Sequence, residues 1–495
     1  MKRIFTLLFI LGVFFNSKAQ VKQVQRTEIQ LESKDENYHL IPIGKEGLMI
    51  FKEGESISRS DDKNWEFIQY DNNFQKSWET TVAIDEDLFF SRYYYDELSV
   101  APKIYILFNR YKSAKKELLV VDILTKKTVR KTFETPKKFS IQSFKAYNDA
   151  VYFMGTIKKS QVIGYYDIQK EGFLQIGVEK GEVLKDIQVR NREGLVDITS
   201  LVNHNKKQGI KLNSFYKNER KSSLTIHPED SDKEKLLDAR MTVVNDEKII
   251  AGTYTTSTFA QGLYISRVTS DKTDYIKYYS FTEFANFFKF LSEKGQEKME
   301  KKIEKKKAKG EDLKVNCRLL LHDLILQDNQ YILLGEAYVP TYRTEYQTRY
   351  VNGRAMTYTT RVFDGYLYTH AVVAGFDKQG KLLWDNCFEM GDVKQYSLKH
   401  MIRVNVENQI VKLIYSYNDH IFTKVVKGNN VVDDKNREEM DKKYEGDKHR
   451  AATRSSTAYW YDNYFLAWGD QRIKNKEDKK VDRKRSVFYF EKIEY

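Results

Sequence analysis

Short apolar runs that end at an aspartate and a polar turn recur along this chain. In the clearest copy, apolar residues lead to Asp377, a polar turn containing Gly380 follows, and a second apolar run contains Trp384. Tyr and Phe, which favour extended structure, occur 34 and 29 times. The pattern therefore predicts repeated strand–turn–strand units and a fold built from many short strands.

These units return at a nearly constant interval. Trp78 follows Asp71 after seven residues, and Asp122 and Asp167 are each followed by an apolar residue at the same offset. The equivalent positions are 71, 122, 167, 217 and 269, so successive copies are 51, 45, 50 and 52 residues apart. A period near fifty residues with several short strands per unit indicates a β-propeller.

Continuing the repeat to the C-terminus predicts an all-β propeller of eight four-stranded blades, with seven blades as the alternative. The last unit lacks a fourth strand, whereas residues 22–31 form one strand too many at the N-terminus. We expect this strand to become the outermost strand of the last blade, because closing the ring removes sheet edges that invite pairing with other chains. Residues 21–495 would then form one domain, with extra length in the charged stretches 433–457 and 473–485.

Two insertions interrupt the period before and within the sixth unit. The first, at about 282–315, has apolar residues at helical spacing (Phe284, Phe287, Phe288 and Leu291), a possible break at Gly295 and a lysine-rich end at 301–309. Its aromatic face is expected to dock on the propeller. The lysines are expected to remain in water or to contact an anionic membrane surface peripherally.

The second insertion, at about 342–365, is predicted to be a β-hairpin centred on Asn352–Gly353, a strong turn signal. It would extend the second and third strands of the sixth blade beyond the ring. Tyr and Arg are enriched at binding hot spots, and many aromatic residues on a projecting hairpin suggest that something covers them. Packing on the chain's own surface is the alternative. The candidate partner-contact residues are Tyr346, Arg349, Tyr350, Arg354, Tyr358 and Arg361.

The run that contains Asp377, Gly380 and Trp384 resembles the tryptophan-docking motif of pyrroloquinoline-quinone-type propellers, a family that tends to have eight blades. The first, second and third units match it in part. The resemblance implies that Asp bonds turn amides, Gly relaxes the turn and Trp packs between blades. Quinoprotein dehydrogenases also need a cofactor pocket, often with adjacent cysteines, and this chain has neither adjacent cysteines nor an assignable calcium-ligand set. The resemblance therefore concerns the fold and implies no cofactor.

The N-terminal twenty residues have the features of a secretory signal. Lys2 and Arg3 precede an apolar run too short to span a membrane, and small residues around Ala19 suit cleavage. No later stretch is long and apolar enough for a membrane helix, so the mature chain is expected to have no transmembrane segment. The formal charge of +13 becomes +10 when Lys2, Arg3 and Lys18 are removed. Nucleic acid is not an expected partner of an exported chain.

Enzyme and metal signatures are not evident in the sequence. The eight histidines show no zinc-binding spacing, and no nucleophile elbow or phosphate-binding glycine loop is present. We therefore assign no catalytic, cofactor or metal residue, although residues assembled across blades would leave no local motif. His322 and Asp323 lie on a predicted inner strand and could face the channel. Cys317 precedes the first strand of its unit and Cys387 lies in the last strand. Because these strands are not neighbours in a four-stranded blade, the two cysteines are not expected to pair.

Together these features favour a non-enzymatic binding or scaffold protein of a bacterial cell envelope. The signal resembles those of Bacteroidota, and propellers of this architecture include an outer-membrane assembly lipoprotein, whose lipidated cysteine is lacking here. The expected partner is an envelope or outer-membrane protein complex. The expected location is the periplasm or the periplasmic face of the outer membrane, with the cell surface or medium as the alternative. A ligand-binding or hydrolytic propeller with a site at the channel mouth is the alternative function.

Overall fold

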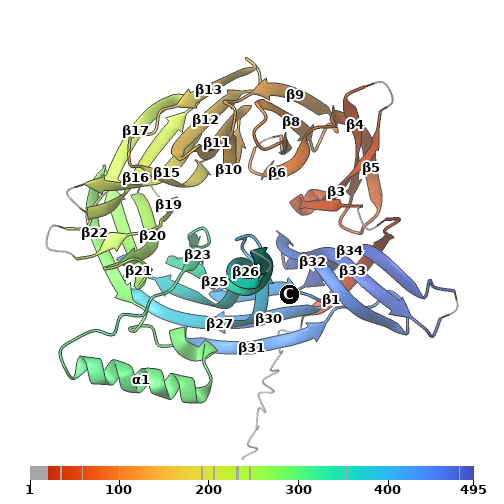
Figure 1. The fold of residues 1–495 in the computed structure, drawn as a ribbon. Coiled ribbons are helices and arrows are strands. Elements are labelled where there is room, and N and C mark those ends of the chain that lie inside the picture. Colours follow the sequence, from red (N-terminus) through yellow and green to blue (C-terminus); the bar gives the residue numbers. More distant parts are fainter. Residues whose placement is uncertain are drawn as a thin grey trace, which may run out of the picture.

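The computed structural model describes residues 21–495, except for residues 34–35, 58–59, 100, 191–192, 205–206, 230–232, 245–246, 352–353 and 479. The predicted signal segment and the Asn352–Gly353 turn lie outside the described residues. Eight antiparallel sheets surround a common axis (Figure 1). The chain is an eight-bladed β-propeller.

The first four blades contain four strands each, in sequence order from the axis outward. Blade 1 consists of β2 (Tyr38–Pro42), β3 (Leu48–Ser56), β4 (Asp62–Tyr70) and β5 (Lys76–Asp85). Blade 2 consists of β6 (Phe89–Asp96), β7 (Lys103–Asn109), β8 (Lys115–Asp122) and β9 (Thr128–Glu134). Blade 3 consists of β10 (Phe139–Tyr147), β11 (Ala150–Ile157), β12 (Ser160–Asp167) and β13 (Gly172–Ile176). Blade 4 consists of β14 (Val183–Arg190), β15 (Leu195–His204), β16 (Lys207–Tyr216) and β17 (Glu219–Ile226).

In blades 5 and 6 the innermost strand is split in two. Blade 5 consists of β18 (Lys235–Leu236), β19 (Arg240–Val244), β20 (Glu247–Thr255), β21 (Gly262–Thr269) and β22 (Lys272–Ser280). Blade 6 consists of β23 (Leu319–Leu321), β24 (Ile325–Gln327), β25 (Gln330–Val351), β26 (Arg354–Phe376) and β27 (Leu382–Gln395). Blade 7 consists of β28 (Arg403–Glu407), β29 (Ile410–Tyr417), β30 (His420–Lys427) and β31 (Asn430–Glu439). Blade 8 consists of β32 (Asp447–Tyr461), β33 (Tyr464–Asn475), β34 (Lys484–Glu494) and β1 (Lys22–Gln30).

The N-terminal strand closes the ring, as the strand count predicted. β1 pairs antiparallel with β34 from Lys22–Glu494 to Gln30–Val487. The charged stretch 433–457 differs from its predicted role as extra length, since most of it belongs to β31 and β32. Strand pairing tolerates charged residues wherever one face of a strand meets water, and apolar content alone therefore underestimated these strands.

The hydrophobic core consists of eight clusters, and each cluster contains residues from two neighbouring blades. The strand β7 shows how this arises. Ile104 and Ile106 pack toward blade 1, whereas Tyr105 and Leu107 pack toward blade 3. Successive side chains of a strand point to opposite faces. A blade covered on both faces therefore has strands that are apolar at consecutive positions.

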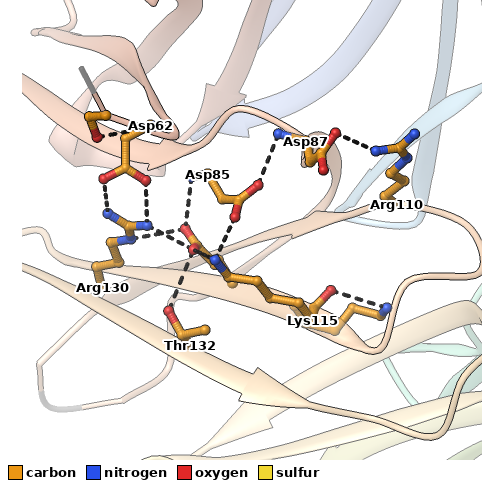
Figure 2. Close-up of polar contacts among 10 residues, drawn as sticks. Asp62, Asp85, Asp87, Arg110, Lys115, Arg130 and Thr132 are labelled. Atoms are coloured by element: carbon orange, nitrogen blue, oxygen red, sulfur yellow. Dashed lines mark hydrogen bonds and ion pairs between the residues drawn. The ribbon is translucent and has the colours of Figure 1, made fainter. Parts of the chain in front are cut away.

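Ion pairs add to this packing at the junction of blades 1 and 2 (Figure 2). Arg130 of β9 donates two hydrogen bonds to Asp62 of β4, at 3.1 and 3.0 Å. The same guanidinium donates two hydrogen bonds to Glu117 of β8, at 2.9 and 2.8 Å, and the side chain of Glu117 is fully buried. The hydrogen bonds from Arg130 lower the pKa of Asp62. The paired geometry lets one arginine hold carboxylates of two blades.

The turns that follow the repeated aspartates have a common structure. Oδ1 of Asp377 accepts hydrogen bonds from the amides of Gln379 and Lys381, and Gly380 has a φ of +73°. Oδ1 of Asp71, Asp122 and Asp167 likewise accepts two turn amides each. These side chains satisfy turn amides that the sheet leaves free, which explains why aspartate recurs at the period of the blades.

The seventh residue after the aspartate differs in burial among the units. Trp384 is buried between blades 6 and 7, and Trp78 packs partly buried between blades 1 and 2. Val129 and Leu174, at the equivalent position of blades 2 and 3, are about half exposed. The docked tryptophan is therefore a feature of particular blades, whereas the aspartate turn is shared more widely.

Candidate functional site

The hairpin insertion extends blade 6 beyond the ring. The strands β25 and β26 stay paired from Tyr331–Phe376 out to Val351–Arg354. Their neighbour β27 pairs with β26 only as far as Tyr366. Beyond that point the hairpin has two strands, so both of its faces are available to solvent or to a partner.

The six predicted contact residues lie on opposite faces of this hairpin. The alternation of side chains and the cross-strand register place Tyr346, Tyr350 and Arg361 on one face, together with Tyr342 and Phe363. We call these five residues the tyrosine face. The guanidinium of Arg361 lies 4.9 Å from the ring centre of Tyr342, which agrees with this assignment. The other three predicted residues, Arg349, Arg354 and Tyr358, lie on the opposite face.

The aromatic side chains of the tyrosine face are largely exposed to solvent. Tyr346 is 74% exposed and Tyr350 is 78% exposed, and Tyr342 is about half exposed. Tyr342 and Phe363 pack edge to face near the base of the extension, with ring centres 6.0 Å apart. Aromatic rings fixed on a strand pair lose little conformational entropy on binding, so this face suits contact with another surface.

The hairpin is also positively charged. Arg343 is paired with Glu345 and Asp364. In the described part of the chain, no carboxylate lies within ion-pair distance of Arg349, Arg354 or Arg361. A surface that combines acidic and apolar groups would complement these side chains.

The insertion before blade 6 differs from the predicted helix. The aromatic residues precede the helix, in a loop and the 3₁₀ turn η2 (Phe287–Phe290), and α1 (Glu293–Lys307) begins after its cap Ser292. Oγ of Ser292 accepts the amide of Gly295, so this glycine belongs to the first turn of α1 and the predicted break there was wrong. Ser292 is the preferred type of N-cap, and the cap sets where the helix begins.

The aromatic segment docks on blades 5 and 6, whereas α1 has no buried residue and lies outside the ring (Figure 1). Phe281 and Phe287 stack with ring centres 4.4 Å apart. Asp385 of β27 accepts the amides of Ala285 and Asn286 at 2.8 and 2.7 Å. These contacts fix the start of the insertion, and the lysines at 301–307 are exposed.

His370 of β26 lies beneath this segment. Its ring stacks on Phe290 with centres 3.7 Å apart, and it is 2% exposed. Burial lowers the pKa of His370 to about 3. The native state therefore keeps this imidazole neutral at pH values where the unfolded chain, with a pKa of about 6.5, binds a proton.

This shift predicts a loss of stability in mild acid. Because the folded pKa lies below the unfolded pKa, the stabilisation is complete above about pH 6.5 and decreases as the pH falls. We expect His370→Gln to reduce the slope of unfolding free energy against pH, between pH 6 and 4, by about 1.4 kcal/mol per pH unit. Urea unfolding of both proteins across this range measures the difference. Equal slopes for the wild type and the variant would show that His370 does not cause the loss of stability in mild acid.

Ionisable side chains converge on the channel side of blades 5, 6 and 7. His322 lies in the break between β23 and β24, and its Nε2 is 2.7 Å from Oε1 of the buried Glu336. Glu336 also accepts the amides of Met401 and Ile402 at 3.0 Å. The imidazole rings of His322 and His400 lie 4.0 Å apart. Burial raises the pKa of Glu336 to about 7 and lowers that of His322 to about 3.

Most of these groups are used for contacts within the protein. The guanidinium of Arg240 donates to the carbonyl oxygens of Ala239 and Leu321, and Arg403 donates to those of His400 and Ile402. A cavity of about 440 Å³ near Asp186 opens beside this cluster. These side chains hold the split inner strands in place through hydrogen bonds within the protein. They therefore give no reason to prefer a ligand site in the channel over the hairpin as the functional site.

Both cysteines are free thiols, and no described helix is long and apolar enough to cross a membrane.

The sequence matches no protein-family model and no curated protein. Among solved structures, the polysaccharide lyase Uly1 aligns with 79% of this chain and 88% of its own, at 9% identity and a TM-score of 0.40.

Other similar structures contain propellers of known proteases. The β-propeller domain of the Trilobed protease from Pyrococcus furiosus aligns over 80% of this chain and 98% of its own, at 8% identity and a TM-score of 0.35. A prolyl endopeptidase aligns over 81% of this chain and 50% of its own, at 8% identity and a TM-score of 0.38. Likeness at this level assigns no activity, and the fold assignment rests on the eight sheets themselves.

Proposed function

We propose that this chain is an exported, non-enzymatic propeller of a bacterial cell envelope that binds a partner protein through the tyrosine face of its hairpin. The observation that carries the proposal is the exposure of Tyr346 and Tyr350 on a strand pair anchored in blade 6. Exposed aromatic patches on a fixed scaffold are typical of interaction sites. The propeller acts as the rigid support that holds the hairpin in place.

The proposed partner belongs to an envelope or outer-membrane complex and presents an acidic rim around an apolar patch. Support for the location comes from the secretory pattern of residues 1–20, which resembles Bacteroidota signals and would deliver the chain to the periplasm. Support for the partner's charge comes from Arg361 of the tyrosine face, which lies over the ring of Tyr342. The lysines at 301–309 form a separate candidate surface for an anionic membrane, and partner binding does not depend on them.

The two faces of the hairpin supply a matched test. The triple variant Tyr346→Ala, Tyr350→Ala, Arg361→Ala removes two tyrosines and an arginine from the tyrosine face. The control Arg349→Ala, Arg354→Ala, Tyr358→Ala removes one tyrosine and two arginines from the other. Truncating hot-spot residues typically costs more than 2 kcal/mol each, so we expect more than tenfold weaker recovery of the partner with the first variant only.

The measurement is affinity capture from envelope fractions, followed by quantification of each recovered protein. Circular dichroism of both variants checks that the propeller is intact. If deletion of residues 342–365 leaves every recovered protein unchanged, the hairpin is not the contact site. If both triple variants lose the same partner equally, charge rather than the tyrosine face governs binding.

A further inference from the structure

A cluster of potential metal ligands lies at the junction of blades 7 and 8. Asp419 is in the turn between β29 and β30, Glu439 ends β31, and His449 is near the start of β32. One potential ligand atom of each residue lies within 4.8 Å of the other two. The residues are 20 and 10 positions apart in sequence, so no short spacing motif reveals them.

His449 is the decisive member of this cluster. Its side chain is 3% exposed, and neither ring nitrogen has a hydrogen-bond partner. Nδ1 faces Oδ2 of Asp419 at 3.9 Å, which is too long for a hydrogen bond. Buried imidazoles are normally satisfied by a donor on one nitrogen and an acceptor on the other. This ring therefore has two unsatisfied nitrogens, and one of them faces the carboxylate of Asp419.

A neighbouring histidine orients Asp419 toward His449. Nδ1 of His420 lies 2.7 Å from Oδ1 of Asp419, which leaves Oδ2 directed at His449. Such a contact from outside the ligand set orients a metal-binding carboxylate.

Two cations near the cluster are already paired. Arg26 contacts Glu28 and Glu491, so its charge is balanced within β1 and β34. Lys442 contacts the exposed Glu439 at 2.9 Å, in a surface pair of the kind that contributes little stability. An ion can displace Lys442 at small cost, and Lys442 is then a competitor whose removal strengthens binding.

We propose that Asp419, Glu439 and His449 bind one divalent transition-metal ion, with Zn²⁺ as the best match. An imidazole nitrogen with two carboxylates suits Zn²⁺ or Mn²⁺, whereas Ca²⁺ and Mg²⁺ prefer sets of oxygen ligands. Three protein ligands leave a coordination position for water or an outside ligand. The ion would join blade 7 to blade 8, beside the strand that closes the ring.

The ligand atoms must move slightly to bind an ion. Zn²⁺ holds nitrogen and oxygen ligands at about 2.0–2.2 Å, so two of its ligands are at most about 4.4 Å apart. Glu439 is exposed and can rotate inward, whereas His449 and Asp419 are held by their neighbours. The site is therefore a partly formed one that Glu439 completes.

The test uses the untagged mature chain, freed of metal by a chelator and then titrated with Zn²⁺ against a chromophoric competitor. We expect one Zn²⁺ per chain and a higher melting temperature with the ion bound. Asp419→Asn, Glu439→Gln and His449→Ala should each weaken binding at least tenfold, and His420→Ala about tenfold. The first two preserve shape, so they carry the test if His449→Ala does not fold.

Glu438→Gln is the matched control, because it removes the same charge one residue away and on the other face of β31. It should bind Zn²⁺ like the wild type, and Lys442→Ala should bind it more tightly. Absence of bound Zn²⁺ at micromolar free concentration would overturn the proposal. Unchanged affinity in the three ligand variants, or equal competition by Ca²⁺, would overturn it as well.

Discussion

Replacing Arg26 by alanine is expected to destabilise the propeller by about 3–5 kcal/mol, because it leaves buried carboxylates unpaired. Arg26 of β1 contacts Glu28 at 3.0 Å and Glu491 at 3.4 Å, and its guanidinium lies 4.4 Å from the ring centre of Tyr489. Glu28 in turn contacts Arg485, which pairs with Asp447. All five charged side chains are at most 5% exposed. The chain of ion pairs joins β1, β34 and β32 where the ring closes.

Lys22→Ala supplies the control on the same strand. Lys22 pairs with Glu494 at the surface, and its loss should change stability by less than about 1 kcal/mol. Burial raises the pKa of Glu491 to about 7, and the charge and hydrogen bond of Arg26 oppose this rise, so loss of Arg26 leaves the ionised form of Glu491 less stable. The double variant Arg26→Ala, Glu491→Gln should therefore recover part of the loss. Thermal unfolding followed by circular dichroism measures all four proteins, and equal midpoints for Arg26→Ala and Lys22→Ala would contradict the prediction.

Trp384→Ala is expected to cost a similar amount, about 3–5 kcal/mol, through the cavity left between blades 6 and 7. Trp384 is 7% exposed, and its Nε1 donates to Gln330 at 2.9 Å. The ring covers Gly375 so closely that a Cβ there would lie 2.2 Å from Cε2 of the indole. Glycine on one strand therefore makes the space that the tryptophan of the next strand fills.

Leu383→Ala is the comparison for this second variant. Leu383 precedes Trp384 on the same strand but is 41% exposed, so its truncation should lie within about 0.5 kcal/mol of the wild type. Calorimetric or circular-dichroism melting suits both variants, since loss of an indole would disturb a fluorescence signal. A midpoint for Trp384→Ala equal to that of Leu383→Ala would mean that the indole contributes only surface coverage.

The repeat pattern predicted the blades because turn chemistry and strand pairing are local. An aspartate such as Asp122, which accepts hydrogen bonds from the amides two and three residues later, recurs at the repeat position of four blades and is visible in the sequence. The surplus of one strand at the N-terminus and the lack of one at the C-terminus were enough to predict the pairing of β1 with β34. The Tyr/Arg hairpin was predicted from local features as well, namely its excess over the repeat length and its turn signal.

Features that depend on neighbouring blades were not predictable in this way. Helical spacing of Phe284 and Phe287 reflects their burial on the propeller, and the helix begins only where Ser292 caps it. The two faces of the hairpin emerged from the cross-strand register, which divides the six candidate residues. The cluster around His449 joins a turn, a strand end and a strand of the next blade, so its signal exists only in three dimensions.

The eight shared clusters have a consequence for how this protein can be divided. Among the described residues, every core cluster is shared by two neighbouring blades, and Tyr105 and Ile106 of a single strand belong to clusters on opposite sides. Removing one blade would remove its residues from two different clusters. The apolar residues of both neighbouring blades would then be exposed to solvent. Neighbouring blades are therefore joined by the same apolar contacts that stabilise each of them, and separating any two would divide one cluster.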